Sequence, residues 1–248
     1  CRRTQHLCEK LKKNSWAAKI QNKTGLIIDP YFSATKVQWI LKNIKGALAK
    51  AKNGELAFGT VDTFLLWKLT KGQSHKTDVS NASRTMLMNL KTLRWDSDLL
   101  KLFQVPEAML PTICPSNSLF GHTQGLDFLP DGLPITGILG DQQAALFGQG
   151  CFDAGEAKCT FGTGSFILLN TGSKIKKSRN KLLTTLAWQI EKQKPLYVLE
   201  GGAFICGAAV QWLRDGLGVI KSSSEVEALA QEVPSSEGVE FVPALTGL

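Results

Sequence analysis

The sequence predicts a mixed helix-and-strand protein of the α/β or α+β class, because the period of its apolar residues changes along the chain. Before Ile135, apolar residues recur mostly at three- and four-residue steps, which is the period of a helix packed on one side. From Ile135 onward, short apolar runs alternate with turns that contain glycine or charged residues, which is typical of strands. The change indicates two domains, residues 1–150 and residues 151–248.

The first domain is predicted to be mainly helical, with helices over residues 5–22, 32–51, 59–69 and 97–103. Thr24-Gly25 ends the first helix, while Ser33 and Thr60 are the expected N-caps of the second and third. One face of the second helix is apolar and is expected to be buried; it consists of Val37, Ile40, Leu41, Ile44 and Leu48.

The second domain is predicted to begin with strands. Ile135–Leu139, just before the boundary, reads as a short buried strand. The turn Gly162-Thr163-Gly164 separates two strand-like runs and so predicts a hairpin. The expected elements are a hairpin over residues 158–170, a strand pair over residues 182–189 and 196–201, and helices over residues 203–217 and 222–233.

Asp141 lies where the Ile135–Leu139 strand gives way to an Ala- and Leu-rich helix. Asp is a favoured N-cap, and the local pattern favours that structural explanation. The same carboxylate is a candidate general base if a substrate hydroxyl comes within hydrogen-bond reach. In that case the neighbouring amide of Gln142 could hold a polyol, since an amide both donates and accepts hydrogen bonds. The residues alone leave both interpretations open.

Three further stretches could carry chemistry, and each also has a structural explanation. In Gly162-Thr163-Gly164, the absence of Cβ atoms would let a phosphate approach the backbone, although a plain hairpin turn needs the same glycines. Glycines around Gly207 permit either close ligand approach at a helix N-terminus or close strand–helix packing. Tyr31 follows a proline turn and is either a packed ring or the wall of a substrate pocket.

Composition and charge exclude several classes of protein. No apolar run reaches the ~18 residues of a transmembrane helix and no signal peptide is present, so we expect a cytoplasmic protein without membrane insertion. The six cysteines form no CxxC pair and the three histidines are scattered, which argues against a zinc site and for reduced thiols. The net charge of +8 comes from residues 1–50. No aromatic residues alternate with these basic ones, so we expect solvated helix faces and no nucleic-acid binding.

Taken together, the motifs resemble the FGGY carbohydrate kinases, and within that family the glycerol kinases. Tyr31–Asn43 meets every constrained position of the family's first signature, and the preceding Thr24–Tyr31 has the form found in glycerol kinases. Further matches occur in the family's order and spacing, at Gly59–Asp62, Asn81–Met86, Gly140–Gly148, Phe161–Gly164 and Gln211–Asp215. The resemblance covers essentially the whole chain.

The resemblance implies an α/β fold of the actin/hexokinase (ribonuclease H-like) type, with two domains around an active-site cleft, incomplete in this chain. Residues 1–150 would be the C-terminal portion of the first FGGY domain, on the glycerol side. Residues 151–248 would be the N-terminal portion of the second, on the ATP side. The implied reaction is phosphorylation of glycerol by ATP to sn-glycerol 3-phosphate, with Mg²⁺ bridging the phosphates.

The resemblance also implies roles for individual residues. Asp141 matches the catalytic base, and the positions that match glycerol-contacting residues are Tyr31, Asp141 and Gln142. The positions that match nucleotide-contacting residues are Gly162, Thr163, Gly207 and Gln211. No protein residue is assigned to a metal. The alternatives that stay open are another sugar or polyol kinase of the same family and a kinase-like protein that binds without catalysis. Homo-oligomerisation of the full-length protein also stays open.

Two departures from the family pattern matter. The family's N-terminal Gly-Thr-Thr-Ser phosphate loop, its Arg-Glu pair that holds glycerol and its C-terminal adenine-binding part have no counterpart here, so we expect an internal fragment that is inactive alone. In bacterial glycerol kinases a Gly-Gly-x-Arg loop binds fructose 1,6-bisphosphate. The corresponding stretch, Gly125–Asp131, contains no Arg, so we expect the full-length enzyme to be insensitive to that sugar bisphosphate.

Overall fold

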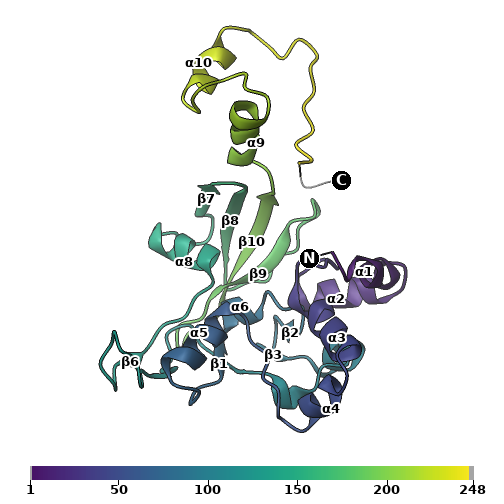
Figure 1. Cartoon of the computed structure of the whole chain (residues 1–248), viewed down its shortest axis with the longest axis vertical. Helices are drawn as coiled ribbons and strands as arrows, with labels where there is room; N and C mark the ends of the chain where they lie inside the picture. The colour runs from purple at the N-terminus through teal and green to yellow at the C-terminus, as the bar shows by residue number, and fades with distance from the viewer. Residues whose placement is uncertain (1, 246–248) are drawn as a thin grey trace.

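The computed structural model describes residues 2–245 and shows a helical part beside a twisted antiparallel sheet (Figure 1). The helices of the first part are α1 (Gln5–Lys12), α2 (Trp16–Thr24), α3 (Ser33–Asn43), α4 (Ala47–Lys52), α5 (Val61–Leu69), α6 (Val79–Ala82), α7 (Ser97–Phe103), the 3-10 turn Glu107–Met109 and α8 (Asp141–Gly148). Its strands are β1 (Lys76–Asp78), β2 (Met88–Asn89), β3 (Arg94–Trp95), β4 (Thr112–Cys114), β5 (Gly121–His122) and β6 (Pro134–Ile135). They form three two-stranded sheets, of which only β1 with β4 is parallel.

The second part contains one four-stranded antiparallel sheet in the order β7-β8-β10-β9. Its elements are β7 (Ala157–Phe161), β8 (Ser165–Gly172), β9 (Leu183–Trp188), β10 (Leu196–Ala203), α9 (Gly207–Gln211), the π-helical turn Trp212–Gly216 and α10 (Glu225–Gln231). The predicted hairpin is therefore confirmed as β7–β8, and the predicted strand pair as β9–β10. In Figure 1, α9 and α10 extend beyond the end of this sheet.

Each of the first two predicted helices is divided in two. Residues 5–22 were expected to be continuous, but the chain turns at Asn14, whose Oδ1 accepts a hydrogen bond from the Trp16 amide at the start of α2. Gly46, at a φ of 80°, separates α3 from α4 within residues 32–51. Ser33 is not the N-cap, because Phe32 takes that position. Thr60 is in the N-cap position of α5, but its hydroxyl donates to the Asp62 carboxylate instead of accepting from the helix.

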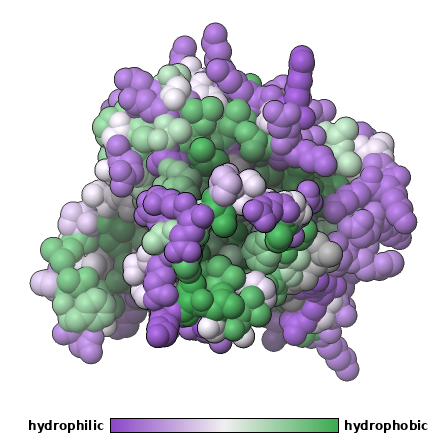
Figure 2. All heavy atoms as spheres, turned by 90° about the horizontal axis from the view of Figure 1, so that it is seen from above, coloured by the Kyte–Doolittle hydropathy of each residue, from purple (hydrophilic) through white to green (hydrophobic). Residues whose placement is uncertain are grey.

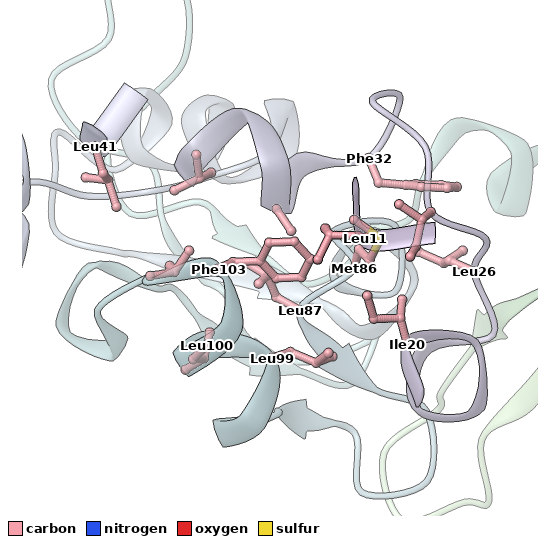
Figure 3. Close-up of a cluster of buried hydrophobic side chains, with 14 of the residues drawn as sticks. Leu11, Ile20, Leu26, Phe32, Leu41, Met86, Leu87, Leu99, Leu100 and Phe103 are labelled. Carbon is pink, nitrogen blue, oxygen red and sulfur yellow. The ribbon is translucent and has the colours of Figure 1, made fainter. Parts of the chain in front are cut away.

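The main hydrophobic core lies where α1–α4 and α7 meet (Figure 3). Figure 3 shows side chains from these helices pointing into one cluster around Phe103, which is fully buried. The apolar face predicted for residues 32–51 is only partly buried: Val37 and Leu41 belong to the core, whereas Ile40 is 49% exposed. Ile40 lies within α3, before the break at Gly46, and it lines a cleft instead of the core.

A second cluster joins the two parts of the chain. Met88 and Leu90 pack there against Leu186 of β9 and Tyr197 of β10. The Tyr197 hydroxyl donates to the Leu90 carbonyl at 2.9 Å, so the buried ring also has its polar atom satisfied. On the opposite side of the sheet, α8 packs through Leu146 on β8, β9 and β10.

Three predicted elements are shorter than expected. Ile135–Leu139 was expected to be a buried strand, but only Pro134–Ile135 pairs, with β5, and residues 136–139 have no strand partner among the described residues. The helix expected over residues 203–217 begins at Gly207 and passes into the π-helical turn, and the last helix covers Glu225–Gln231 only. The helix predicted over residues 97–103 is confirmed as α7.

Two properties of the described residues bear on the predictions from composition. In residues 2–245, no helix combines the length and the apolar character needed to cross a membrane. Within the same range the cysteines are all free thiols, of which Cys8 and Cys151 are buried and Cys159 is exposed.

Candidate active-site cleft

A cleft of about 1080 Å³ lies between the helical part and the sheet, and it brings three predicted site residues together. Tyr31, Asp141 and Gln142 all line it, although 110 positions separate the first from the second. Its other polar lining residues include Lys36, Asp62, Asn81, Arg84 and Glu200, and its apolar ones include Phe58 and Phe166. A cleft of this size with converging polar groups is the usual form of a small-molecule site.

The N-terminus of α8 is anchored beneath this cleft by a buried polar network. The Gly140 amide donates to the Ser80 hydroxyl at 2.9 Å, and that hydroxyl donates to Asp78 at 2.9 Å. Asp78 is fully buried, and burial raises the pKa of its carboxyl. It also accepts a hydrogen bond from the Ser116 hydroxyl at 2.8 Å. The start of α8, and with it Asp141, is therefore held rigidly.

Asp141 is not the N-cap that the local pattern favoured. Gly140 has that position, and Asp141 is the first residue of α8. Its Oδ1 accepts only the adjacent Gln142 amide, at 2.8 Å, among the described hydrogen bonds, and the residue is exposed at the cleft. No side chain at the N-cap position bonds the first turn of α8; Ser80 holds the Gly140 amide, and the Asp141 carboxylate lies at the cleft. This geometry favours the general-base interpretation over the cap.

Gln143 has a purely structural position beside these two residues. It is 2% exposed, and its Nε2 donates to the Leu186 carbonyl of β9 at 3.2 Å. A Cβ at position 140 would lie 2.6 Å from the Gln143 Oε1, so a side chain there would displace the end of Gln143. The contact ties α8 to the sheet.

Gln142 is held by a residue that sequence reasoning missed. Lys158 of β7 is 5% exposed, and its Nζ donates to the Gln142 Oε1 and, at 2.8 Å, to the Thr160 hydroxyl. Burial lowers the pKa of the Lys158 ammonium, while the negative charges of Asp141 and Glu200 act in the opposite direction. The only signal in the sequence was a lysine at an alternating position of a strand, which is not distinctive.

Tyr31 forms one wall of the cleft and is 57% exposed. Its carbonyl accepts a hydrogen bond from Lys36 Nζ at 2.8 Å, which ties the loop to α3. The guanidinium of Arg84 lies 5.8 Å from the centre of the Tyr31 ring, a cation–π arrangement. Arg84 also pairs with Glu200 of β10 at 2.5 Å, across the boundary between the two parts. Sequence reasoning found neither partner of this ion pair as a site residue.

The four predicted nucleotide-contacting residues form a second group, outside the cleft lining. Backbone hydrogen bonds join the β7–β8 turn to α9: the Gly207 amide donates to the Gly162 carbonyl at 2.9 Å, and the Ala208 amide to the Thr163 carbonyl at 3.1 Å. A Cβ on Gly207 would lie 2.6 Å from the Gly162 carbonyl oxygen. Close packing therefore accounts for Gly207, and Gln211 is the last residue of α9.

The turn itself remains open to a ligand. Gly162 and Thr163 are exposed, and a Cβ on Gly162 would meet nothing closer than 3.7 Å. Phe166, three residues beyond Thr163 along the chain, lines the cleft, whereas Gly162 and Thr163 do not. In residues 2–245, no group of three or more His, Cys, Asp or Glu side chains is arranged to hold a metal ion.

Models of two protein domains match the chain. Residues 1–148 match the N-terminal domain, and residues 157–248 the C-terminal domain, of the "FGGY family of carbohydrate kinases". Glycerol kinase from Bdellovibrio bacteriovorus is 72% identical over all 248 residues, and the glycerol kinase of Carboxydothermus hydrogenoformans is 54% identical. The chain spans 50% of the first relative and 49% of the second.

Solved structures show the same fold. A crystal structure of Plasmodium falciparum glycerol kinase with ADP superposes with a TM-score of 0.89 at 40% identity, over 99% of this chain and 49% of that one. Xylulose kinase from Rhodospirillum rubrum has a TM-score of 0.80 at 21% identity, also over 99% of this chain and 49% of that one, which supports the fold alone. The predicted fold class is confirmed, and the fold is incomplete because the chain covers about half of these neighbours.

Proposed function

The chain belongs to the FGGY family of carbohydrate kinases, and from this premise we propose that it is part of a glycerol kinase about twice its length. The reaction would be the transfer of the terminal phosphoryl group of ATP to glycerol, giving sn-glycerol 3-phosphate, in the cytoplasm. Residues 1–150 would belong to the glycerol-side domain, and residues 151–248 to the ATP-side domain. The relatives support glycerol as substrate, because those that match at 72% and 54% identity are glycerol kinases.

The observation that carries the proposal is the meeting of Tyr31, Asp141 and Gln142 in one cleft. Asp141 would take the proton of the attacking glycerol hydroxyl as its oxygen forms a bond to the γ-phosphorus and the bond to ADP breaks. Gln142 would hydrogen-bond the polyol, and the Tyr31 ring would form the wall against which its carbon chain lies. A rigidly anchored α8 suits this role, because small errors in position cost large factors in rate.

The exposed β7–β8 turn would contact the phosphates of ATP. Its open approach at Gly162 fits a phosphate, and the Thr163 hydroxyl would add a donor. Gly207 and Gln211 would lie along the nucleotide on α9. Mg²⁺ would supply charge neutralisation at the phosphates, and proteins often hold it by one or two carboxylates together with substrate phosphates. The exposed carboxylate of Asp141 is the group of the cleft that would contact it.

The test is an ATP-dependent phosphorylation assay on the full-length protein with glycerol, xylulose and gluconate as alternative acceptors. We expect kcat/KM for glycerol to exceed that for the two larger acceptors by about a hundredfold or more, since pocket contacts fitted to a small polyol are not made equally by a larger molecule in the transition state. A preference for xylulose or gluconate would replace the proposed substrate but keep the family. Tight glycerol binding without any turnover would favour a non-catalytic binding protein instead.

A further inference from the structure

Lys158 is buried in a strand that is otherwise exposed. In β7 the burial does not alternate, and Lys158 is the one buried residue between Ala157 and Phe161. Phe161, at the end of the same strand, is 77% exposed. A buried lysine beside exposed apolar residues is the reverse of the usual arrangement, because removing an ammonium group from water is costly unless it is paired.

The partners of Lys158 explain where its charge is compensated. Its Nζ donates to the Gln142 Oε1 and to the Thr160 hydroxyl, which is on the same face of β7 two residues on. Asp141 and Glu200 contribute the negative charges that act on it. Glu200 is in turn paired with Arg84. Positive and negative groups therefore alternate from Arg84 through Glu200 and Lys158 to Asp141.

The contact with Lys158 determines which end of the Gln142 amide is available to a ligand. An ammonium group has only donors, so the atom it contacts must be the amide oxygen. The oxygen is thereby occupied, and the Nε2 hydrogens remain as donors at the cleft that Gln142 lines. A hydroxyl that accepts from Nε2 has its own proton free for an acceptor, and Asp141 is the adjacent carboxylate.

We propose that Lys158 is a positioning residue of the acceptor site, which fixes the Gln142 amide so that it donates to the reacting hydroxyl and turns that hydroxyl's proton toward Asp141. The inference rests on the proposed function, because it assigns a role within the same phosphoryl transfer. Lys158 itself does not contact the acceptor. It acts through Gln142, whose orientation would otherwise be free to invert.

A purely structural role for Lys158 is the competing explanation. β7 is an edge strand of its sheet, and an inward-pointing charge is one way in which edge strands avoid pairing with other molecules. That role predicts loss of solubility or stability in a Lys158 variant, with no specific link to Gln142. The two explanations therefore predict different values of kcat/KM for a variant in which Lys158 and Gln142 are both replaced.

The experiment measures glycerol kinetics and thermal unfolding of the full-length protein carrying Lys158→Met, Gln142→Ala or both. We expect each single variant to lower kcat/KM by about tenfold or more, the effect of a lost or misdirected hydrogen bond. The double variant should lose no more than the worse single one, because both act through the same contact. Lys158→Met should keep its midpoint of thermal unfolding, since Met fills a similar volume and removes a buried charge.

Controls separate this inference from the proposed function. Lys194→Met, in the exposed turn between β9 and β10, should match the wild type in every measurement. Gln142→Glu keeps an oxygen for Lys158 but has no N–H donor, so it should stay folded and still lose tenfold or more in kcat/KM. An active wild type whose Lys158→Met variant stays within twofold, or whose double variant shows the product of the single losses, overturns the inference alone. A wild type without turnover overturns the proposed function together with it.

Discussion

At the scale of residues, three consecutive polar side chains have three different environments. Asp141 is exposed at the cleft, Gln142 is fixed by Lys158, and Gln143 is buried against β9. The apolar run before Asp141 singled this residue out in the sequence. The family resemblance then predicted that Gln142 and Tyr31 belong to the same site. Lys158 could not be found in this way, because the burial of a lysine depends on which elements pack over it.

The Arg84–Glu200 ion pair is expected to matter for stability because one partner is nearly inaccessible. The Glu200 side chain is 6% exposed, so Arg84→Met would leave a buried carboxylate without its counter-charge. We expect the free energy of unfolding of the 248-residue chain to fall by about 3 kcal/mol in urea denaturation. The matched control is Arg214→Met, whose partner Asp215 is exposed, and it should change nothing measurable. Equal losses in the two variants would contradict this assignment.

At the scale of elements, the strands of the second part and α7 were predicted, whereas the short strands β1–β5 and the breaks in the helices were not. The β7–β8 hairpin, the β9–β10 pair and α7 follow directly from period and turn residues. The divisions at Asn14 and Gly46 were missed because the apolar period continues across both. The strand expected at Ile135–Leu139 is mostly absent, since among the described residues only Pro134–Ile135 finds a pairing partner there.

The N-cap of α7 predicts how stability depends on pH. The Asp96 carboxylate caps α7, and although burial raises its pKa, hydrogen bonds from Lys23 and Asn89 outweigh burial and bring the pKa below its ordinary value of 3.8. A lowered folded-state pKa means that this stabilisation is complete above pH 3.8 and is lost as the pH falls through the folded-state pKa. Asp96→Asn should therefore cost about 2 kcal/mol at pH 7 and much less at pH 3, measured by urea unfolding. A difference that does not depend on pH would contradict the role of the charge.

Gly25 tests the junction between α2 and the sheet. It ends α2 at a φ of 72°, its carbonyl accepts the Thr184 amide at 3.0 Å, and a Cβ there would lie 2.0 Å from the Thr184 carbonyl oxygen. Gly46→Ala is the matched control, since Gly46 has a φ of 80° and no atom within 4 Å of an added Cβ. The control should lose about 1 kcal/mol from the φ strain alone, and Gly25→Ala should lose at least 2 kcal/mol more, by thermal or urea unfolding. Similar losses would show that the clash is relieved without cost.

At the scale of the whole molecule, much apolar surface is open. α5 exposes Val61, Phe64 and Leu65 by more than half, and Phe204 beyond β10 is 69% exposed. Figure 2, which views the molecule from above relative to Figure 1, shows apolar residues across the middle of that face with hydrophilic ones around them. Exposed patches of this kind mark surfaces that normally have a partner. The chain spans about half the length of the relatives it matches, which accords with such a partner being the rest of the same protein.

The most direct test of the general-base assignment compares wild type and Asp141→Asn in the full-length protein, by a coupled assay of glycerol-dependent ADP release. Asp127→Asn, at an exposed site in the Gly125–Asp131 loop, is the matched control, and the 248-residue chain alone is expected to show no turnover. We expect Asp141→Asn to lower kcat by about 10²–10⁴-fold, the usual contribution of a general base, with the control unchanged. A variant that keeps its rate within tenfold of wild type would show that Asp141 is not the base.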